Sequence, residues 1–394
     1  MKKKIFTALI VALLLATLPS FKGMAKGTVQ SEGVGSIVEE LYKQLDSGYF
    51  DEYTSRESFA EMFGFSSIPD FLRALLRGES SISLASFVNA VLASIRGQLG
   101  DLIKLCFQVV ALAALCGLIS NMSSPVFSDA IRDSTFFAVY LALGTIVIKV
   151  CFDSIAECTK VVLELVDFMN VATPAFLVLL AVNGGILTTG VLSPTLLMFT
   201  NLTTYIVNSF VLPVMGFSVI MHFVENLLDG IDVSLFTQFI KKGCAFTLGI
   251  MFTFFSAVIA FEGVSFGSVD GVTAKAVKYA ASNLIPVVGG FLSGSLDTIS
   301  GFVLVIKNTI GIVGMLIVVS IAASPVISLT MVFFALKASS IIVQPFADKR
   351  FSEFVDNAAG CMLFIDMCVL VVGIMFIIII ALFLMAGSYI TMLR

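Results

Sequence analysis

The stretch that decides the fold is Met367-Cys-Val-Leu-Val-Val-Gly-Ile-Met-Phe-Ile-Ile-Ile-Ile-Ala-Leu-Phe-Leu-Met-Ala-Gly387. It contains no charged residue. A helix that crosses the hydrocarbon core of a bilayer needs about 20 consecutive, mostly apolar residues. Residues 367–387 therefore predict a membrane-spanning helix.

The composition of the whole chain agrees with this prediction. Of the 394 residues, 58% are hydrophobic and 13% are charged, whereas soluble domains carry about 25% charged residues. Residues 1–101 hold 21 of the charged residues, which leaves 29 for the remaining 293 positions. We therefore expect a modest polar N-terminal part joined to a large membrane part. The net charge of −4 gives no basic face for nucleic acid.

Further apolar runs predict an all-α, polytopic membrane protein with about six to eight spans and amphipathic interfacial helices. The run 302–336 is too long for one simple crossing and contains Pro325. The other runs are 102–120, 135–152, 172–192, 195–223 and 244–262.

The N-terminus has the pattern of a cleavable signal peptide over residues 1–25, with an uncleaved anchor as the alternative. Lys2, Lys3 and Lys4 precede an apolar run, Ile5 to Leu18, which is too short for a spanning helix. Residues 26–100 are then expected to be an exported segment of amphipathic helices, and residues 101–394 the membrane domain. The helix predicted from Ser83 onward should run into the first span.

Five charged residues between two apolar runs are spaced for one helix face. They are Asp153, Glu157, Lys160, Glu164 and Asp167. A solvated stripe at the membrane surface is one interpretation. The other is an acidic face that lines a pore vestibule or docks a partner.

The membrane domain contains an internal repeat, with units of about 161–262 and 273–387. Pro174 and Pro213 are separated by 39 residues, as are Pro286 and Pro325. Repeats of this kind build transporter sites at the interface of two halves. Similar positions of Lys241-Lys242 and Lys349-Arg350 favour parallel rather than inverted repeats.

Each repeat contains an interrupted apolar segment. Asn183-Gly184-Gly185 interrupts residues 172–192, and Ile285-Pro286-Val287-Val288-Gly289-Gly290 interrupts the segment before residue 302. Interruptions at corresponding places indicate either a transport pathway or close packing of helices through small residues.

The chain lacks the residue sets of the common enzymes, and it is therefore predicted to be non-enzymatic and to need no cofactor or metal. His222 is its only histidine, and no phosphate-binding loop Gly-x-x-x-x-Gly-Lys-Ser/Thr occurs. None of the seven cysteines lies in a Cys-x-x-Cys pair. They are expected to be small apolar residues in helix interfaces.

A few polar residues inside apolar runs are candidates for a pathway or for structural pairing, because such groups are costly in lipid. Lys307 and Asn308 lie early in the run 302–336, where they are expected to face Asp297 or a subunit interface. Asp366, at the start of the last run, is expected to lie at the polar mouth of that span.

An ordered series of polar and small residues carries a family resemblance. It includes Asp270-Gly271-Val272-Thr273, Lys278, Asn283, Ile285-Pro286-Val287-Val288-Gly289, Asp297-Thr298 and Lys307-Asn308. This series resembles the stage III sporulation protein AE family of endospore-forming bacteria. The resemblance extends over the membrane domain, and it is weaker in the exported segment.

The resemblance implies a membrane protein made in the mother cell and placed in the membrane around the engulfed forespore. It also implies membership of an oligomeric, secretion-like channel complex needed for forespore development, with an ATPase and ring-forming proteins of the same operon as partners. The family offers no catalytic residues to carry over. A self-contained permease for a small solute, built from the two repeats, is the alternative.

Overall fold

The computed structural model describes residues 48–55, 57–65, 84–121, 129–182, 186–227, 233–284 and 289–392. These residues are almost entirely helical and include no strand. The chain divides into two compact units, Met1–Phe87 and Val88–Arg394. The predicted signal peptide and the helices expected before Gly48 and around residues 68–78 lie outside the described residues.

The described part of the first unit is built around aromatic side chains. Helices α3 (Gly48–Thr54) and α4 (Glu57–Phe63) are short, and Gly64 follows α4 with a φ of 80°, which favours glycine. Phe59 is buried and packs its ring against Phe63 and Phe65 at centroid distances of 5.1 and 5.3 Å. This cluster gives the small unit an apolar centre of its own.

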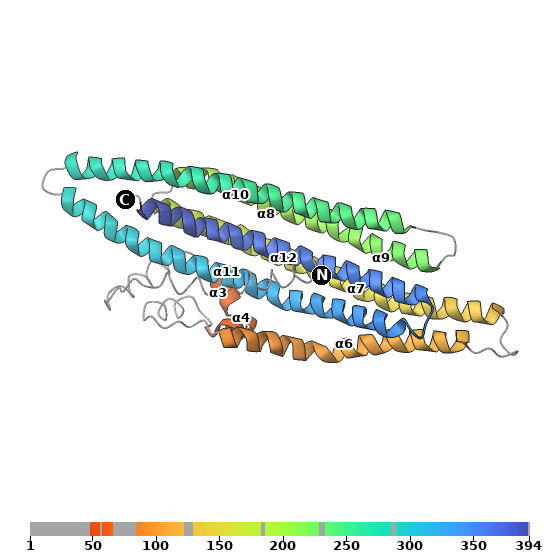
Figure 1. Ribbon diagram of the computed structural model, residues 1–394. Coiled ribbons are helices and arrows are strands. Elements are labelled where there is room, and N and C mark those ends of the chain that lie inside the picture. The colour runs from red at the N-terminus through yellow and green to blue at the C-terminus, as the bar shows by residue number, and fades with distance from the viewer. Residues whose placement is uncertain are drawn as a thin grey trace. The chain divides into compact units, whose positions relative to one another are not determined.

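The second unit is a bundle of long helices in which consecutive helices run in opposite directions (Figure 1). Helix α6 (Leu84–Asn121) is followed by α7 (Asp129–Val182). Three segments then form one bent rod: α8 (Ile186–Ile206), the π-helical turn η2 (Val207–Val211) and α9 (Leu212–Leu227). Helices α10 (Ser234–Leu284), α11 (Gly289–Val343) and α12 (Lys349–Met392) complete the bundle.

The expectation of an all-α membrane protein is confirmed. Six helical stretches of the described chain are long and apolar enough to cross a membrane, which is the lower end of the predicted range. The sequence has seven apolar runs but the described chain has six such stretches, because α7 joins the run 135–152 and residues 172–182 in one helix. The run 172–192 is therefore not a span, because α7 ends at Val182 and α8 begins at Ile186.

The interruptions inferred from glycine and proline therefore separate whole helices. Residues 183–185 fall between the oppositely directed α7 and α8, and residues 285–288 between α10 and α11 (Figure 1). Residues 153–167 are helical as expected, but they form the middle of α7 rather than a separate helix between spans.

The helices are longer than a bilayer requires. At 1.5 Å per residue, the 54 residues of α7 extend about 80 Å, whereas a bilayer with its headgroups is about 40–45 Å thick. Helices α10 and α11 are of similar length. Part of each long helix must therefore project beyond the membrane.

Helix α12 is the central helix, and it packs against α11, α7, α10 and α9. Phe383 of α12 stacks on Phe176 of α7 at 5.3 Å. Nearer the start of α12, Phe351 and Phe354 pack on the buried Tyr140 of α7 at 5.4 and 5.8 Å. Ring contacts at both ends fix α12 against α7 along most of its length.

The two prolines matched in the predicted repeat have different local effects. Pro213 follows the π-helical turn η2. A proline lacks the N–H that an α-helix needs, and a π-turn is one way to accommodate a local break in the hydrogen-bond pattern. Pro325 lies inside the continuous helix α11.

The arrangement of helices agrees with parallel repeats, although the duplication itself stays a prediction. The rod α8–α9 followed by α10 is an antiparallel pair, and so is α11 followed by α12. Both α10 and α12 begin at the same end of the bundle (Figure 1), so Lys241 and Lys349 lie toward that end.

Polar side chains on the outer faces satisfy their donors within their own helix. The hydroxyls of Thr145 and Thr253 donate to the carbonyl oxygens four residues earlier, both at 2.8 Å. The amide of Asn201 does the same, to Leu197 O at 2.8 Å. Such bonds suit lipid-facing surfaces, where water is absent.

Candidate functional site

Most of the predicted site residues lie where the structure describes no side chain. Asp270, Lys278 and Asn283 fall on α10, and Gly289 and Asp297 fall on α11. Asn183, Gly184, Gly185 and Pro286 lie outside the described residues. Of the predicted set, Lys307 and Asn308 can be examined in atomic detail.

Lys307 fastens α11 to the C-terminal part of α12. Its side chain is 1% exposed, and Nζ donates to the carbonyl oxygens of Phe383 at 3.3 Å and Leu384 at 2.9 Å. A buried ammonium must find acceptors, because an unsatisfied charge is costly in an apolar medium. Lys307 therefore joins α11 to α12, and its partners among the described residues are backbone carbonyl groups.

Asn308 differs from its neighbour. Its Oδ1 atom is buried and has no hydrogen-bond partner within the described chain. The adjacent pair is therefore not one site, because Lys307 is occupied by α12 while the Asn308 carbonyl is left with an open acceptor.

A polar junction, which we define as Glu157, Cys158, Ser328, Thr330 and Asp366, links α7, α11 and α12. Ser328 Oγ donates to Glu157 Oε2 at 3.5 Å, and Thr330 Oγ1 donates to Asp366 Oδ2 at 2.7 Å. Cys158 Sγ lies 3.7 Å from the carbonyl oxygen of Ile365, next to Asp366. Three helices thus contribute polar groups to one place in the bundle.

Asp366 is the most unusual member of the polar junction. It is 1% exposed, and Oδ1 has no partner among the described residues. No ion pair within the described part of the chain includes it. The expectation that Asp366 lies at a polar mouth was wrong, because α12 begins at Lys349 and packing of α7 and α11 encloses the carboxyl group.

The polar junction lies at the depth where the other helices are free of charge. No charged residue occurs in 168–224, 243–261, 308–336 or 367–393. Ser328 of the junction belongs to one of these stretches. Lys241 of α10 lies just before the charge-free stretch 243–261. It approaches α12, because its Nζ atom would lie 3.9 Å from a Cβ atom placed on Gly360.

Helix α7 is the exception at this depth. Asp153, Lys160 and Asp167 are exposed, and Glu157 and Glu164 are half-buried. Because Glu157 reaches Ser328 of α11, its carboxyl group is level with the charge-free stretch 308–336. A charged face at membrane depth normally meets water or protein rather than lipid.

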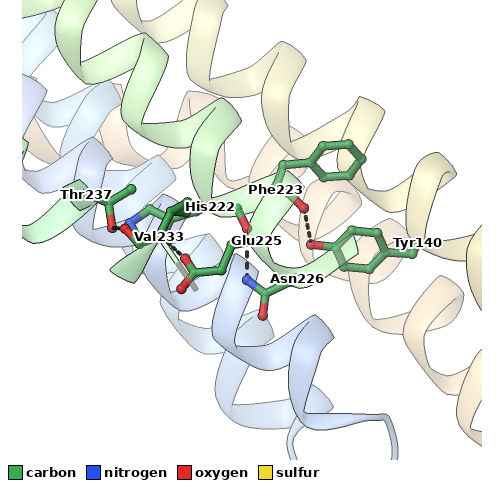
Figure 2. Close-up of polar contacts among 7 residues, drawn as sticks. All are labelled: Tyr140, His222, Phe223, Glu225, Asn226, Val233 and Thr237. Carbon is green, nitrogen blue, oxygen red and sulfur yellow. Dashed lines mark hydrogen bonds and ion pairs between the residues drawn. The ribbon is translucent and has the colours of Figure 1, made fainter. Parts of the chain in front are cut away.

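Near one end of the bundle, a second polar cluster surrounds His222 on α9 (Figure 2). His222 Nδ1 lies 3.2 Å from Glu225 Oε2, and Asn226 donates to His222 O at 2.9 Å. Tyr140 of α7 donates its hydroxyl to Phe223 O at 3.1 Å and so ties α7 to α9. On α10, Thr237 donates to Val233 O at 3.2 Å.

The inward face of the α8–α9 rod leaves several polar atoms without partners in the described structure. These atoms are Thr200 Oγ1, Thr203 Oγ1, both amide atoms of Asn208, Ser218 Oγ and His222 Nε2. Each such group costs about 1–3 kcal/mol when it is left unsatisfied. Ordered water is the usual partner of polar groups in this position.

No cluster of three or more His, Cys, Asp or Glu side chains within the described chain is arranged to bind a metal ion. All seven cysteines are free, and all but Cys106 are buried, which confirms the expected packing role. What the site offers chemically is protonatable and hydrogen-bonding groups at membrane depth.

Sequence reasoning missed the polar junction because its members are far apart in the chain. One signal was available, since Asp366 is the sole charged residue between Asp356 and Arg394. Its partners Thr330 and Cys158 are unremarkable in the sequence, and packing alone brings them together.

Comparison with known proteins adds the family. The model of the family described as stage III sporulation protein AE matches residues 66–387. A relative named stage III sporulation protein AE, from Bacillus subtilis (strain 168), is 22% identical over 400 residues, and the match covers all of both chains. No solved structure matches. The family is one of sporulation proteins rather than an enzyme family, and the chain belongs to the stage III sporulation protein AE family.

Proposed function

We propose that this protein is a non-enzymatic membrane component of a channel complex between the mother cell and the forespore. It would lie in the mother-cell membrane that surrounds the forespore and act after engulfment. Its partners would be the ATPase and ring-forming proteins of the same operon. Membership of a sporulation family and six apolar helices support this proposal.

The observation that carries the proposal is the charged outer face of α7. Asp153, Lys160 and Asp167 are exposed on the part of α7 from which Glu157 reaches Ser328, within a helix long and apolar enough to cross a membrane. A bundle that worked alone would present these groups to lipid, at a cost of about 2.5–3.5 kcal/mol for a charge near the bilayer centre. Another protein subunit or a water-filled lumen removes that cost, which favours an assembled complex.

The alternative of a self-contained permease loses part of its support. It rested on the internal repeat and on Lys307 and Asn308 at membrane depth, and of these Lys307 is held by the Phe383 and Leu384 carbonyl groups. A lysine with its donors occupied by a neighbouring helix has a packing role. The unpaired groups on the α8–α9 rod still leave room for a hydrated path.

A gene deletion is the first test. We expect a deletion strain to complete engulfment and then to arrest, without late forespore gene expression. Restoration by the wild-type gene is the control. Normal spores from the deletion strain would refute the proposal.

Removing two negative charges from the outer face of α7 tests whether this face is needed for assembly. Asp153→Asn with Asp167→Asn should leave the amount of protein in the membrane unchanged and reduce its co-purification with the operon partners. Glu353→Gln is the matched control, because Glu353 is half-exposed near the start of α12 and pairs with Lys349 at 3.0 Å. Equal recovery of partners by both variants would contradict the assembly role of α7.

Reconstitution of the purified protein in liposomes distinguishes a channel component from a self-contained permease. Protein purified alone and placed in liposomes should move no metabolite from a panel of small solutes. Solute uptake without the operon partners would instead establish the permease.

A further inference from the structure

We propose that Asp366, together with Thr330, is a proton-binding site at membrane depth. Nothing in the channel role requires such a site, and the inference does not depend on that role. The binding step is simple: Asp366 accepts a proton on a carboxylate oxygen to become a carboxylic acid, and it later returns the proton to water.

The geometry around Asp366 suits a group that changes between two protonation states. One oxygen, Oδ2, has a close partner in Thr330 Oγ1 at 2.7 Å, while Oδ1 is buried and open among the described residues. A threonine hydroxyl both donates and accepts. The contact with Thr330 can therefore persist when the carboxyl group gains a proton, with donor and acceptor exchanged.

If Asp366 were permanently ionised, its buried negative charge would have no positively charged partner among the described residues. No ion pair among the described residues includes it, and its side chain is 1% exposed. Intramembrane carboxyl groups that face a bundle interior commonly serve as proton relays for this reason. A proton satisfies the carboxylate without requiring any other ligand.

A metal cation fits the site less well than a proton. Hard cations need about six oxygen ligands, whereas the structure places one hydroxyl on Asp366. No cluster of metal-binding side chains occurs in the described chain. A sodium ion therefore becomes an outcome that the experiment can detect, rather than the proposed ligand.

The Glu157–Ser328 bond lies close in sequence to the Thr330–Asp366 bond on α11. Glu157 is half-buried and accepts from Ser328, which is two residues before Thr330 on α11. Cys158, next to Glu157, interacts electrostatically with both Glu157 and Asp366.

Lys241 of α10 lies beside Gly360 of α12, six residues before Asp366. Besides Glu157, the other titratable groups near Asp366 in the described part of the chain are thiols. They come from α7, α10 and α12: Cys158, Cys244 and Cys368. The α8–α9 rod contributes no charged residue before Glu225, and α11 contributes none between Lys307 and Lys337. A titration that belongs to a carboxyl group here can therefore be assigned to Asp366 or Glu157.

Infrared difference spectroscopy tests the site directly. The full-length protein in lipid nanodiscs is compared between mildly acidic and mildly alkaline buffer. We expect a carboxylic-acid C=O band that appears and disappears with pH. The band should be lost in Asp366→Asn and shifted in frequency in Thr330→Val, because Thr330 bonds to the carboxyl group.

Two controls complete the test. Glu353→Gln should leave the band unchanged, because Glu353 lies outside the polar junction. Replacing choline by sodium in the buffer should also leave it unchanged. A band that follows sodium rather than pH would overturn the proposal, as would spectra of Asp366→Asn identical to those of the wild type. If Asp366→Asn fails to fold, an unshifted band in Thr330→Val is by itself a refutation. None of these outcomes depends on sporulation, so they are independent of the proposed channel role.

Discussion

Helices α12 and α6 are both long and apolar, yet the bundle uses them in opposite ways. In the most apolar window of α12, 61% of the residues are buried inside the protein, against 17% for α6. On α6, Phe107 and Ile103 are 72% and 66% exposed. On α12, Phe376 and Phe383 are almost completely enclosed.

In a membrane protein, therefore, the apolar content of a helix does not predict whether the helix is buried in the bundle or faces outward. Lipid tails are as apolar as a protein core, so no hydrophobic force selects which helix is enclosed. Close packing and polar contacts make the selection. Helix α12 has Asp366, the bonds from Lys307 and the Lys337–Asp356 ion pair, whereas a bond from Cys106 to Ala335 O ties α6 to α11.

The largest expected effect comes from reversing the charge of Lys307. Lys307→Glu places a carboxylate against the Phe383 and Leu384 carbonyl groups and should prevent accumulation of folded protein. An uncompensated buried charge by itself costs roughly 3–5 kcal/mol, and repulsion between the carboxylate and the carbonyl oxygens adds to that cost. Membrane abundance and resistance to trypsin are the measurements.

The matched control for this variant is on α6. Lys104 is exposed, so Lys104→Glu should leave both measurements near the wild-type level. If both reversals are tolerated equally, the distinction between the inner and the outer helix fails.

A smaller loss is expected when an inner ring is removed. Phe383→Ala should destabilise the bundle by about 3–5 kcal/mol, the range for a buried Phe, because Phe383 stacks on Phe176. Phe107→Ala on α6 should change stability by less than about 0.5 kcal/mol. Thermal unfolding in nanodiscs compares the two, and equal shifts would show that α12 is not enclosed.

Crowding the inner interface should cost less again. A Cβ atom added at Gly311 of α11 would overlap the side chain of Leu384 on α12. Gly311→Leu is therefore expected to destabilise by about 1–3 kcal/mol through overpacking. Gly100→Leu on α6, where nothing lies within 4 Å of the added atom, is the control for the same thermal measurement. A lower melting temperature in the control than in Gly311→Leu would contradict this packing of α11 on α12.

The smallest effect is expected at the edge of the inner helix. Lys337 and Asp356 form an ion pair between α11 and α12, with both side chains nearly half exposed. Exposed pairs contribute about 0.2–1 kcal/mol, so Asp356→Asn should lower the melting temperature slightly, and high salt should reduce the difference. A loss as large as that of Phe383→Ala would mean that this pair, rather than ring packing, holds α12.

Much of the fold could be predicted from the sequence. The runs of apolar residues predict an all-α membrane protein. Glycine and proline mark residues 183–185 and 285–290 as interruptions, although α11 already begins at Gly289. The number of crossings is harder to predict, because a charged stretch between two apolar runs looks like a surface segment. In the structure that stretch continues α7 without a break, since nothing in residues 153–170 stops a helix.

The candidate site could be predicted only in part. Lys307 stands out because a lysine is rare in such a run, and in the structure it donates to two backbone carbonyl groups of α12. Asp366 is harder to place, because the charge-free run begins directly after it and suggests the start of a span. The helix in fact starts at Lys349, which puts Asp366 well inside the bundle.

Composition, periodicity and ordered motifs can be read directly from the chain, and they are enough to predict a helical membrane protein of this family. Which apolar helix is enclosed, and which polar groups meet, depends on how the helices pack. A bilayer treats every apolar face alike, so those choices depend on contacts between residues far apart in the chain. Thr330 and Asp366 are such a pair, 36 positions apart and joined by a 2.7 Å hydrogen bond.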